Sequence, residues 1–333
     1  MNVCWWRRRD EPESSDLQIK ETNAALHMER GNTECSVSTS FSSTSFGSFD
    51  SNYPITGQYS DVNVNYRISS VVLGSGRYGT VRECTHRSTG ESFAVKSVEK
   101  AQVRALEYLQ REIFMLSKIN HENIVKMVDC YEDSQYVHIV TEKCAGGEVY
   151  EKVISSVNQD GCLSEDDAII IIKQLLRAVS HLHKNNMVHR DIKPENCLFV
   201  SRNSSSIKLI DFGLSCIHSQ GEPNLTARVG SCYYMSPQIL NRNYDKSADI
   251  WSVGVVTYIL LCGYLPFNGD QDDEVEKAIH ACDYNFIHGW ANKSHDALDF
   301  IRCLLKKDSR ERLTADEALT HPWLNGVSTA TRK

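Results

Sequence analysis

The stretch that decides the fold of this chain reads His189-Arg190-Asp191-Ile192-Lys193-Pro194-Glu195-Asn196. It packs an acid, a base, an amide and a proline into one loop, after a helical run and before the apolar residues 198–200. Ionisable groups beside a buried strand cost free energy unless they are paired or used in chemistry. The stretch therefore predicts a functional loop, and the motifs that accompany it along the chain indicate which function.

Size and composition limit the classes of protein that fit. A chain of 333 residues with 41% hydrophobic residues can bury a large core, as one bilobal unit or two domains. The net charge of -7 argues against a surface for nucleic acid. The 12 cysteines include no C-x-x-C pair, a pattern typical of reduced thiols rather than disulfides or zinc sites. The longest apolar run, Val253 to Phe267, is short for a spanning helix. We therefore expect a cytoplasmic protein with no transmembrane segment.

The first 62 residues are polar and rich in Ser and Thr, particularly between Cys35 and Ser51. Such a composition buries too little apolar surface to offset the entropy of ordering, so it predicts a disordered tail. Cys4 stands close to the basic run Arg7-Arg8-Arg9. One acyl chain beside basic residues can anchor a protein weakly, so membrane association through Cys4 is a hypothesis.

A glycine-rich turn joins two predicted strands and reads Gly74-Ser75-Gly76-Arg77-Tyr78-Gly79. The pattern G-x-G-x-x-G alone also fits a dinucleotide-binding oxidoreductase. In that alternative a helix follows the glycines, whereas Thr80 to Cys84 is typical of a strand. Val81 completes G-x-G-x-x-G-x-V. We interpret the turn as a loop that covers the phosphates of a nucleotide.

Three further motifs occur in a fixed order. Lys96 lies in an apolar strand, Glu112 lies on a segment with apolar residues at helical spacing, and Asp211-Phe212-Gly213 follows a short apolar strand. Together with H-R-D-x-K-x-x-N, they resemble the eukaryotic protein kinases in their serine/threonine form. The resemblance covers about residues 66 to 324.

The resemblance implies an α+β, bilobal protein kinase fold. A small N-lobe of β-sheet and one helix precedes a larger, mainly helical C-lobe, and a disordered N-terminal tail precedes both. The expected boundaries are 1–62 for the tail, 63–141 for the N-lobe, 142–147 for the hinge, 148–325 for the C-lobe and 326–333 for a short C-terminal tail.

The resemblance also implies the site. The expected catalytic residues are Asp191, which would orient a substrate hydroxyl, Lys193, which would neutralise the migrating phosphoryl group, and the Lys96–Glu112 pair, which would hold the triphosphate. Asn196 and Asp211 would ligate Mg²⁺, which prefers hard oxygen ligands. The expected ATP-binding residues are Leu73, Gly74, Gly76, Gly79, Val81, Ala94, Lys96, Thr141, Glu142, Cys144, Glu148, Glu195, Leu198 and Asp211. The implied activity is transfer of the γ-phosphoryl group of Mg-ATP to Ser or Thr hydroxyls of protein substrates.

One motif departs from the family pattern. Kinases usually end the activation segment with A-P-E, whereas this chain has Ser236-Pro237-Gln238. The family glutamate pairs with a late arginine, here Arg312. A charged hydrogen bond contributes about 1.5–3 kcal/mol and a neutral one about 1, so Gln238 predicts a weaker anchor. The departure motivates one alternative, a pseudokinase scaffold that binds ATP without efficient transfer, although Lys96, Asp191 and Asp211 are all present.

Other strings resemble the calcium/calmodulin-dependent branch, and most closely the calcium-dependent protein kinases of protists and plants. These are the strings 138–142, 146–148, 211–215 and 244–252. No calcium-loop pattern D-x-[DN]-x-[DN]-G-x₅-E occurs in the sequence, so any calcium control is expected to come from a separate calcium sensor.

Regulation and substrate preference follow from the same resemblance. The usual phosphoacceptor position of the activation segment falls on Ala227 rather than Thr226, so we expect activity without obligatory loop phosphorylation. Glu148 and Glu195 occupy positions that meet upstream arginines in basic-directed relatives. We therefore expect a monomeric kinase that prefers Arg three residues before the target Ser or Thr.

Overall fold

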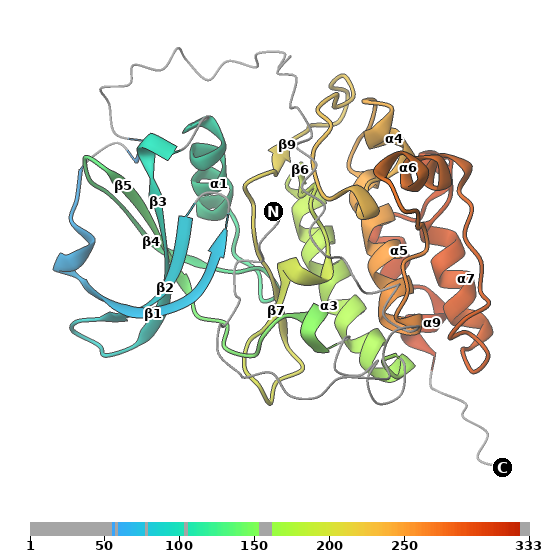
Figure 1. Cartoon of the computed structure of the whole chain (residues 1–333), viewed down its shortest axis with the longest axis horizontal. Helices are drawn as coiled ribbons and strands as arrows, with labels where there is room; N and C mark the ends of the chain where they lie inside the picture. The colour runs from blue at the N-terminus through green and yellow to red at the C-terminus, as the bar shows by residue number, and fades with distance from the viewer. Residues whose placement is uncertain (1–54, 57–58, 77–78, 103–105, 153–161, 327–333) are drawn as a thin grey trace.

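The computed structural model describes residues 55–56, 59–76, 79–102, 106–152 and 162–326. These residues form two lobes, with the β-sheet and one helix at the left of Figure 1 and a mainly helical lobe at the right. The predicted α+β bilobal fold is confirmed. The hypothesis about Cys4 and Arg7–Arg9 and the predicted tail after 326 lie outside the described residues.

The N-lobe is an antiparallel sheet in the order β1-β2-β3-β5-β4. On β3 alternate side chains face opposite sides, so Val95 packs with the cluster around Tyr66, whereas Val98 packs with the cluster that contains Leu109 of α1. Lys96 shares the side of Val98 and is thereby directed toward α1. The bounds are β1 Tyr66–Gly76, β2 Gly79–His86, β3 Ser92–Glu99, α1 Leu106–Lys118, β4 Met127–Glu132 and β5 Tyr136–Glu142, with 3-10 turns η1 Val62–Val64 and η2 Lys100–Gln102.

The described part of the chain contacts the N-lobe earlier than residue 63. The Thr56 backbone N–H donates to Glu132 Oε2 at 2.8 Å and its hydroxyl donates to the same oxygen at 3.0 Å. Lys100 donates to the other oxygen, Oε1, at 2.7 Å. Glu132 is fully buried, so these donors supply the partners that its carboxylate needs. These contacts of Thr56, and that of the Ser60 N–H with Glu132 O at 2.7 Å, lie ahead of residue 63, the predicted start of the N-lobe.

Two long helices form the centre of the C-lobe. α3 starts after Ser164, whose hydroxyl accepts from the Asp167 backbone N–H as the N-cap. α5 is buried along almost its whole length and ends at Gly263, whose φ of 80° suits a residue without Cβ. No helix in the described ranges is long and apolar enough to cross a membrane. The bounds are α3 Glu165–Lys184, α4 Pro237–Leu240, α5 Ser247–Cys262, α6 Asp272–Ala281, α7 His295–Leu304, α8 Ala315–Leu319 and α9 Pro322–Asn325.

Short strands of the C-lobe flank the predicted functional loop, and a backbone hydrogen bond beside them joins the two lobes. The Val125 N–H, before β4, donates to Leu209 O at 3.0 Å, so the N-lobe is tied directly to the β7–β8 hairpin. The loop 189–196 lies between β6 and β7 and is held from both ends. The bounds are β6 Met187–Val188, β7 Cys197–Phe199, β8 Ile207–Leu209 and β9 Cys216–Ile217, with 3-10 turns η3 Pro194–Asn196, η4 Cys232–Tyr234 and η5 Ser309–Glu311.

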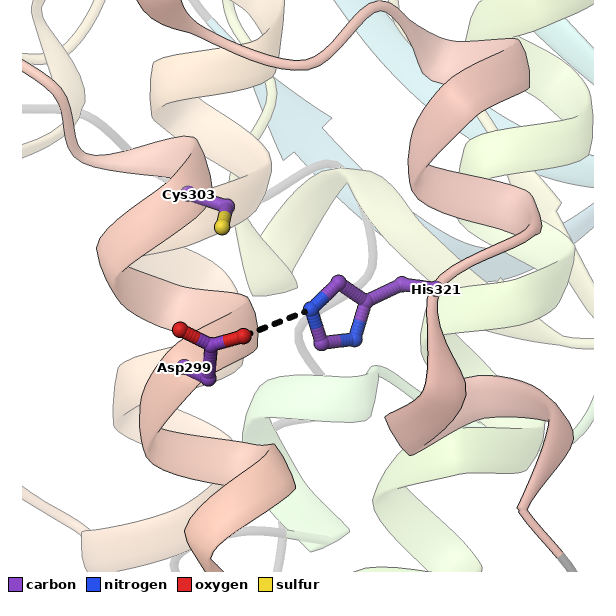
Figure 2. A group of neighbouring side chains, drawn as sticks. All are labelled: Asp299, Cys303 and His321. Atoms are coloured by element: carbon purple, nitrogen blue, oxygen red, sulfur yellow. Dashed lines mark hydrogen bonds and ion pairs between the residues drawn. The ribbon is translucent and has the colours of Figure 1, made fainter.

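Asp299, Cys303 and His321 lie close together where α7 meets the start of α9 (Figure 2). His321 Nε2 lies 3.3 Å from Asp299 Oδ2, and Nδ1 accepts the Trp323 backbone N–H at 3.2 Å. An accepting Nδ1 places the single proton of neutral imidazole on Nε2. Metal binding at Nε2 would need that proton to move to Nδ1, which would break the helix cap. We therefore assign these three residues a structural role, in which the contact between Asp299 and His321 joins α7 to the start of α9.

The predicted contact between Gln238 and Arg312 is present. Arg312 Nη2 donates to Gln238 Oε1 at 2.6 Å, and the amide group of Gln238 donates to Lys307 O at 2.7 Å. A carboxylate could accept from Arg312 but could not donate to Lys307. Burial lowers the pKa of Arg312 to about 10, and its guanidinium also lies over the Trp251 ring at 4.9 Å. Gln238 thus lacks the negative charge of the usual glutamate, but its amide forms a second hydrogen bond, to Lys307 O.

Removing this amide should destabilise the C-lobe. Gln238→Ala deletes both hydrogen bonds and leaves a buried guanidinium with fewer acceptors, so we expect the free energy of unfolding to fall by about 1–3 kcal/mol. Urea unfolding, monitored by tryptophan fluorescence, measures this change in the free energy of unfolding. Gln238→Glu, which trades the Lys307 bond for a charge, is expected to stay within about 1 kcal/mol of the parent chain. If the urea midpoint of Gln238→Ala equals that of the parent chain, the hydrogen bonds of Gln238 do not stabilise the C-lobe.

Candidate active site

A cavity of about 480 Å³, its open mouth included, lies between the lobes. Seven of the predicted ATP-binding residues line it, and so does Glu112 from the predicted catalytic set. These seven are Val81, Lys96, Thr141, Glu142, Cys144, Leu198 and Asp211. Four further residues line the cavity that were not among the predicted site residues, namely Leu116, Val125, Ile139 and Ile210. Each is an ordinary apolar position, and only Ile210, directly before Asp211, carried a local signal.

Six other predicted ATP-binding residues lie on strands that carry cavity residues, or pair with such strands. Ala94 is buried and pairs with Thr141 across β3 and β5. Glu148 is buried and bridges to Leu198, which lines the cavity. Leu73, Gly74 and Gly76 end β1, and Gly79 starts β2. A Cβ on Gly79 would lie 2.3 Å from Ser97 O, so the close approach of β2 to β3 there requires glycine.

A buried ion pair links β3 to α1. Lys96 Nζ lies 2.7 Å from Glu112 Oε1 and 2.8 Å from Oε2, and both residues are only 5% exposed. Burial raises the pKa of Glu112, while the ammonium group of Lys96 opposes that rise. This buried pair therefore ties α1 to β3.

The backbone of the loop 189–196 is held by one carboxylate from α5. Asp249 Oδ2 accepts the His189 N–H and Oδ1 accepts the Arg190 N–H, each at 2.9 Å. His183 Nε2 lies 2.9 Å from Oδ2. Burial alone would raise the pKa of Asp249, but the hydrogen bond and charge of His183 lower it below the usual value. These bonds hold Arg190 at a φ of 69°, a left-handed conformation that a side chain of this size rarely adopts.

Asp191 stands at the centre of the loop. Its Oδ1 accepts from the Ser231 hydroxyl at 2.9 Å, and its Oδ2 lies 2.9 Å from Lys193 Nζ. Lys193 also donates to the Ser231 hydroxyl at 2.8 Å. Burial raises the pKa of Asp191, but the charge and hydrogen bond of Lys193 outweigh it and keep the pKa below its usual range. The carboxylate is therefore ionised at neutral pH.

Asn196 and Asp211 supply oxygen atoms beside Asp191. The amide group of Asn196 donates to Asp191 O at 2.8 Å and to Oδ2 at 3.0 Å, so its carbonyl oxygen stays available as a ligand. Asp211 lines the cavity and has a φ of 64°, again in the left-handed region. A carboxylate and an amide oxygen match the hard donors that Mg²⁺ takes from proteins.

The residues 68–324 match the protein kinase domain family. That match covers more than half of the chain, so the chain belongs to this family.

Within the family it is similar to calcium-dependent protein kinases. It is 40% identical to calcium-dependent protein kinase 5 of Plasmodium falciparum over 262 residues, which are 78% of this chain and 45% of that protein. It is 38% identical to calcium-dependent protein kinase 20 of Oryza sativa subsp. japonica over 276 residues, 81% of this chain and 49% of that protein. The predicted resemblance is confirmed. The chain spans about half the length of these relatives.

The contacts of Asp249 predict a specific acid response. A carboxylate whose pKa is lowered by folding stabilises the fold above its unfolded pKa of about 3.9, and this contribution is lost as the pH falls through the folded pKa. Asp249→Asn should lower the free energy of unfolding at pH 7 by about 3–5 kcal/mol, because it removes the charge and turns one of the two acceptor oxygens into an NH₂ donor that faces a buried donor. Below about pH 4 the variant should lose less stability per pH unit than the parent chain.

Thermal unfolding between pH 3 and pH 7 tests both expectations. Asp273→Asn, on the exposed start of α6, serves as the control and should follow the parent chain closely. Identical pH slopes for the parent chain and Asp249→Asn would contradict the assignment.

Proposed function

We propose that this protein is a serine/threonine protein kinase that transfers the γ-phosphoryl group of ATP to hydroxyl groups of protein substrates. The observation that carries the proposal is the buried Asp191 carboxylate, set between Lys193 and Ser231, in a protein whose inter-lobe cavity Lys96 and Asp211 line. Phosphoryl transfer depends on positioning and on charge neutralisation rather than on covalent catalysis by the protein. The arrangement provides both.

Each residue has one task in this mechanism. Asp191 accepts a hydrogen bond from the attacking hydroxyl, aligns its oxygen with the γ-phosphorus and receives its proton as the bond to phosphorus forms. Lys193, held 2.9 Å from Asp191 Oδ2, offers its ammonium group to the charge on the migrating phosphoryl oxygens. Lys96, fixed by Glu112, binds the phosphates that stay on the leaving nucleotide.

Asn196 and Asp211 would hold magnesium. When bound, the ion supplies positive charge that neutralises the phosphate oxygens. The amide group of Asn196 is oriented by Asp191, which leaves the carbonyl oxygen for the ion. The hinge residues Glu142 and Cys144 would bond the adenine edge through their backbone.

Substitution of the proposed base tests the mechanism. Asp191→Asn should lower phosphate transfer from Mg-ATP to a Ser peptide by about 100-fold or more, because proton transfer by a positioned group contributes about 10²–10⁴-fold. Binding of ATP, measured by thermal shift, should persist. Activity that survives in Asp191→Asn would contradict the role. A parent chain that bound ATP without transfer would favour the scaffold alternative, but nothing in the site supports that alternative.

The proposed substrates carry arginine upstream of the acceptor. Glu195 Oε2 is buried and has no hydrogen-bond partner among the described residues. Burial raises the pKa of Glu195, with Lys193 opposing, so a second cation at this carboxylate is favourable. Glu148, which is buried nearby on the chain segment after the hinge, is the second proposed contact.

Peptide kinetics test this preference. Glu195→Gln should raise the KM for a peptide with upstream arginines by about 10-fold, a loss typical of one charged hydrogen bond. The KM for the matching alanine peptide should not change. Glu311→Gln, an exposed site on η5, is the control. Equal KM values for both peptides with the parent chain would rule out the preference.

Three other features of the proposal concern the whole protein. The protein acts as a monomer in the cytoplasm, with association through Cys4 as a further hypothesis. Calcium control, which the names of the relatives indicate for those proteins, would reach this chain through a separate calcium sensor. Comparing activity with calcium present and chelated, with and without cell extract, distinguishes a direct from a mediated effect.

A further inference from the structure

Arg190 is a buried cation that the proposed chemistry does not use. It is 5% exposed, and none of the described carboxylates forms an ion pair with its guanidinium. Its Nε donates to Leu214 O at 2.6 Å and its Nη1 donates to the Tyr244 hydroxyl at 3.1 Å. A buried guanidinium needs acceptors, and here both are neutral.

Tyr244 connects this arginine to the activation segment. Its hydroxyl accepts from Arg190 and donates to Ala227 O at 2.7 Å. Its backbone pairs with Leu225 in both directions, at 2.8 and 3.1 Å. Tyr244 is 1% exposed, and burial raises its pKa, with Arg190 opposing, so the hydroxyl stays neutral. One side chain therefore fixes Ala227 relative to Arg190.

The position of Ala227 determines where Ser231 lies. The next residue, Arg228, pairs with Glu276 on α6. At Gly230, with φ of 108°, the segment passes so close to the loop that a Cβ would lie 2.5 Å from Arg190 O. Ser231 then reaches Asp191 with both its N–H, at 3.1 Å, and its hydroxyl, at 2.9 Å. Ser231, which contacts the proposed catalytic carboxylate, thus lies four positions after Ala227, which contacts Tyr244.

We propose that the Tyr244 hydroxyl is a positioning group that holds the activation segment in its working conformation, in place of a phosphate on the segment. The inference rests on the proposed function. It explains how a chain in which Tyr244 links Ala227 to Arg190 can be active without loop phosphorylation. Thr226, which is exposed, is not required.

Tyr244→Phe removes only this hydroxyl. We expect kcat for a Ser peptide to fall about 10-fold, with the KM for ATP unchanged, because the cavity residues keep their contacts. Tyr258→Phe is the matched control, since that buried hydroxyl donates to Asn285 O at 2.7 Å far from the loop. It should leave kcat unchanged, and so should Thr226→Ala.

Rescue distinguishes positioning from general destabilisation. Ala227→Glu in the Tyr244→Phe background offers Arg190 a carboxylate, and we expect it to restore kcat at least about threefold, since a charged acceptor makes a stronger bond than a neutral one. An equal loss of kcat in Tyr258→Phe, or parent-level kcat in Tyr244→Phe, would overturn the proposal.

Hydrogen exchange provides a readout that does not depend on kinase activity. In Tyr244→Phe the amide of Ser231 should exchange faster than in the parent chain, whereas the amides of α3 should not change. If the parent chain shows no transfer, the proposed function fails, but exchange still reports whether Tyr244 holds the segment. Unchanged exchange at Ser231 would reject the positioning role on its own.

Discussion

The buried carboxylate of Asp249 is the constraint on which the site depends. It accepts two consecutive backbone N–H groups, those of His189 and Arg190, and so fixes the direction in which the loop leaves β6. A loop with φ in the left-handed region at Arg190 would relax without those bonds. The carboxylate itself comes from α5, which is almost entirely buried, so the rigidity of the C-lobe core is transmitted to Asp191.

The N-lobe side of the site is held by other contacts. Lys96 and Glu112 join β3 to α1, and the Val125 N–H bonds to Leu209 O across the lobe boundary. The ion pair and the packing of Leu109 with Val98 therefore hold α1 against the sheet, while Leu198, Ile210 and Asp211 line the C-lobe side of the cavity.

Much of this architecture could be predicted from the sequence, because the informative residues are polar and unusually placed. Lys96 inside an apolar strand and Gln238 opposite Arg312 are examples, and both were found at the predicted partners. Leu116 and Ile139 line the cavity but look like any core residue, so no local pattern identified them. Tyr244 was quoted only as part of a string, since its role depends on a contact between segments 17 residues apart.

The contacts of Thr56 with Glu132 show that the folded domain starts ahead of the kinase family match. The kinase family match starts at residue 68, yet the buried Glu132 carboxylate on β4 takes two of its hydrogen bonds from Thr56. Tyr66 and Val62, also ahead of the match, are buried in the N-lobe. The folded domain thus extends ahead of the family match, and a fragment that began at residue 68 would leave the buried Glu132 carboxylate without two of its hydrogen-bond donors.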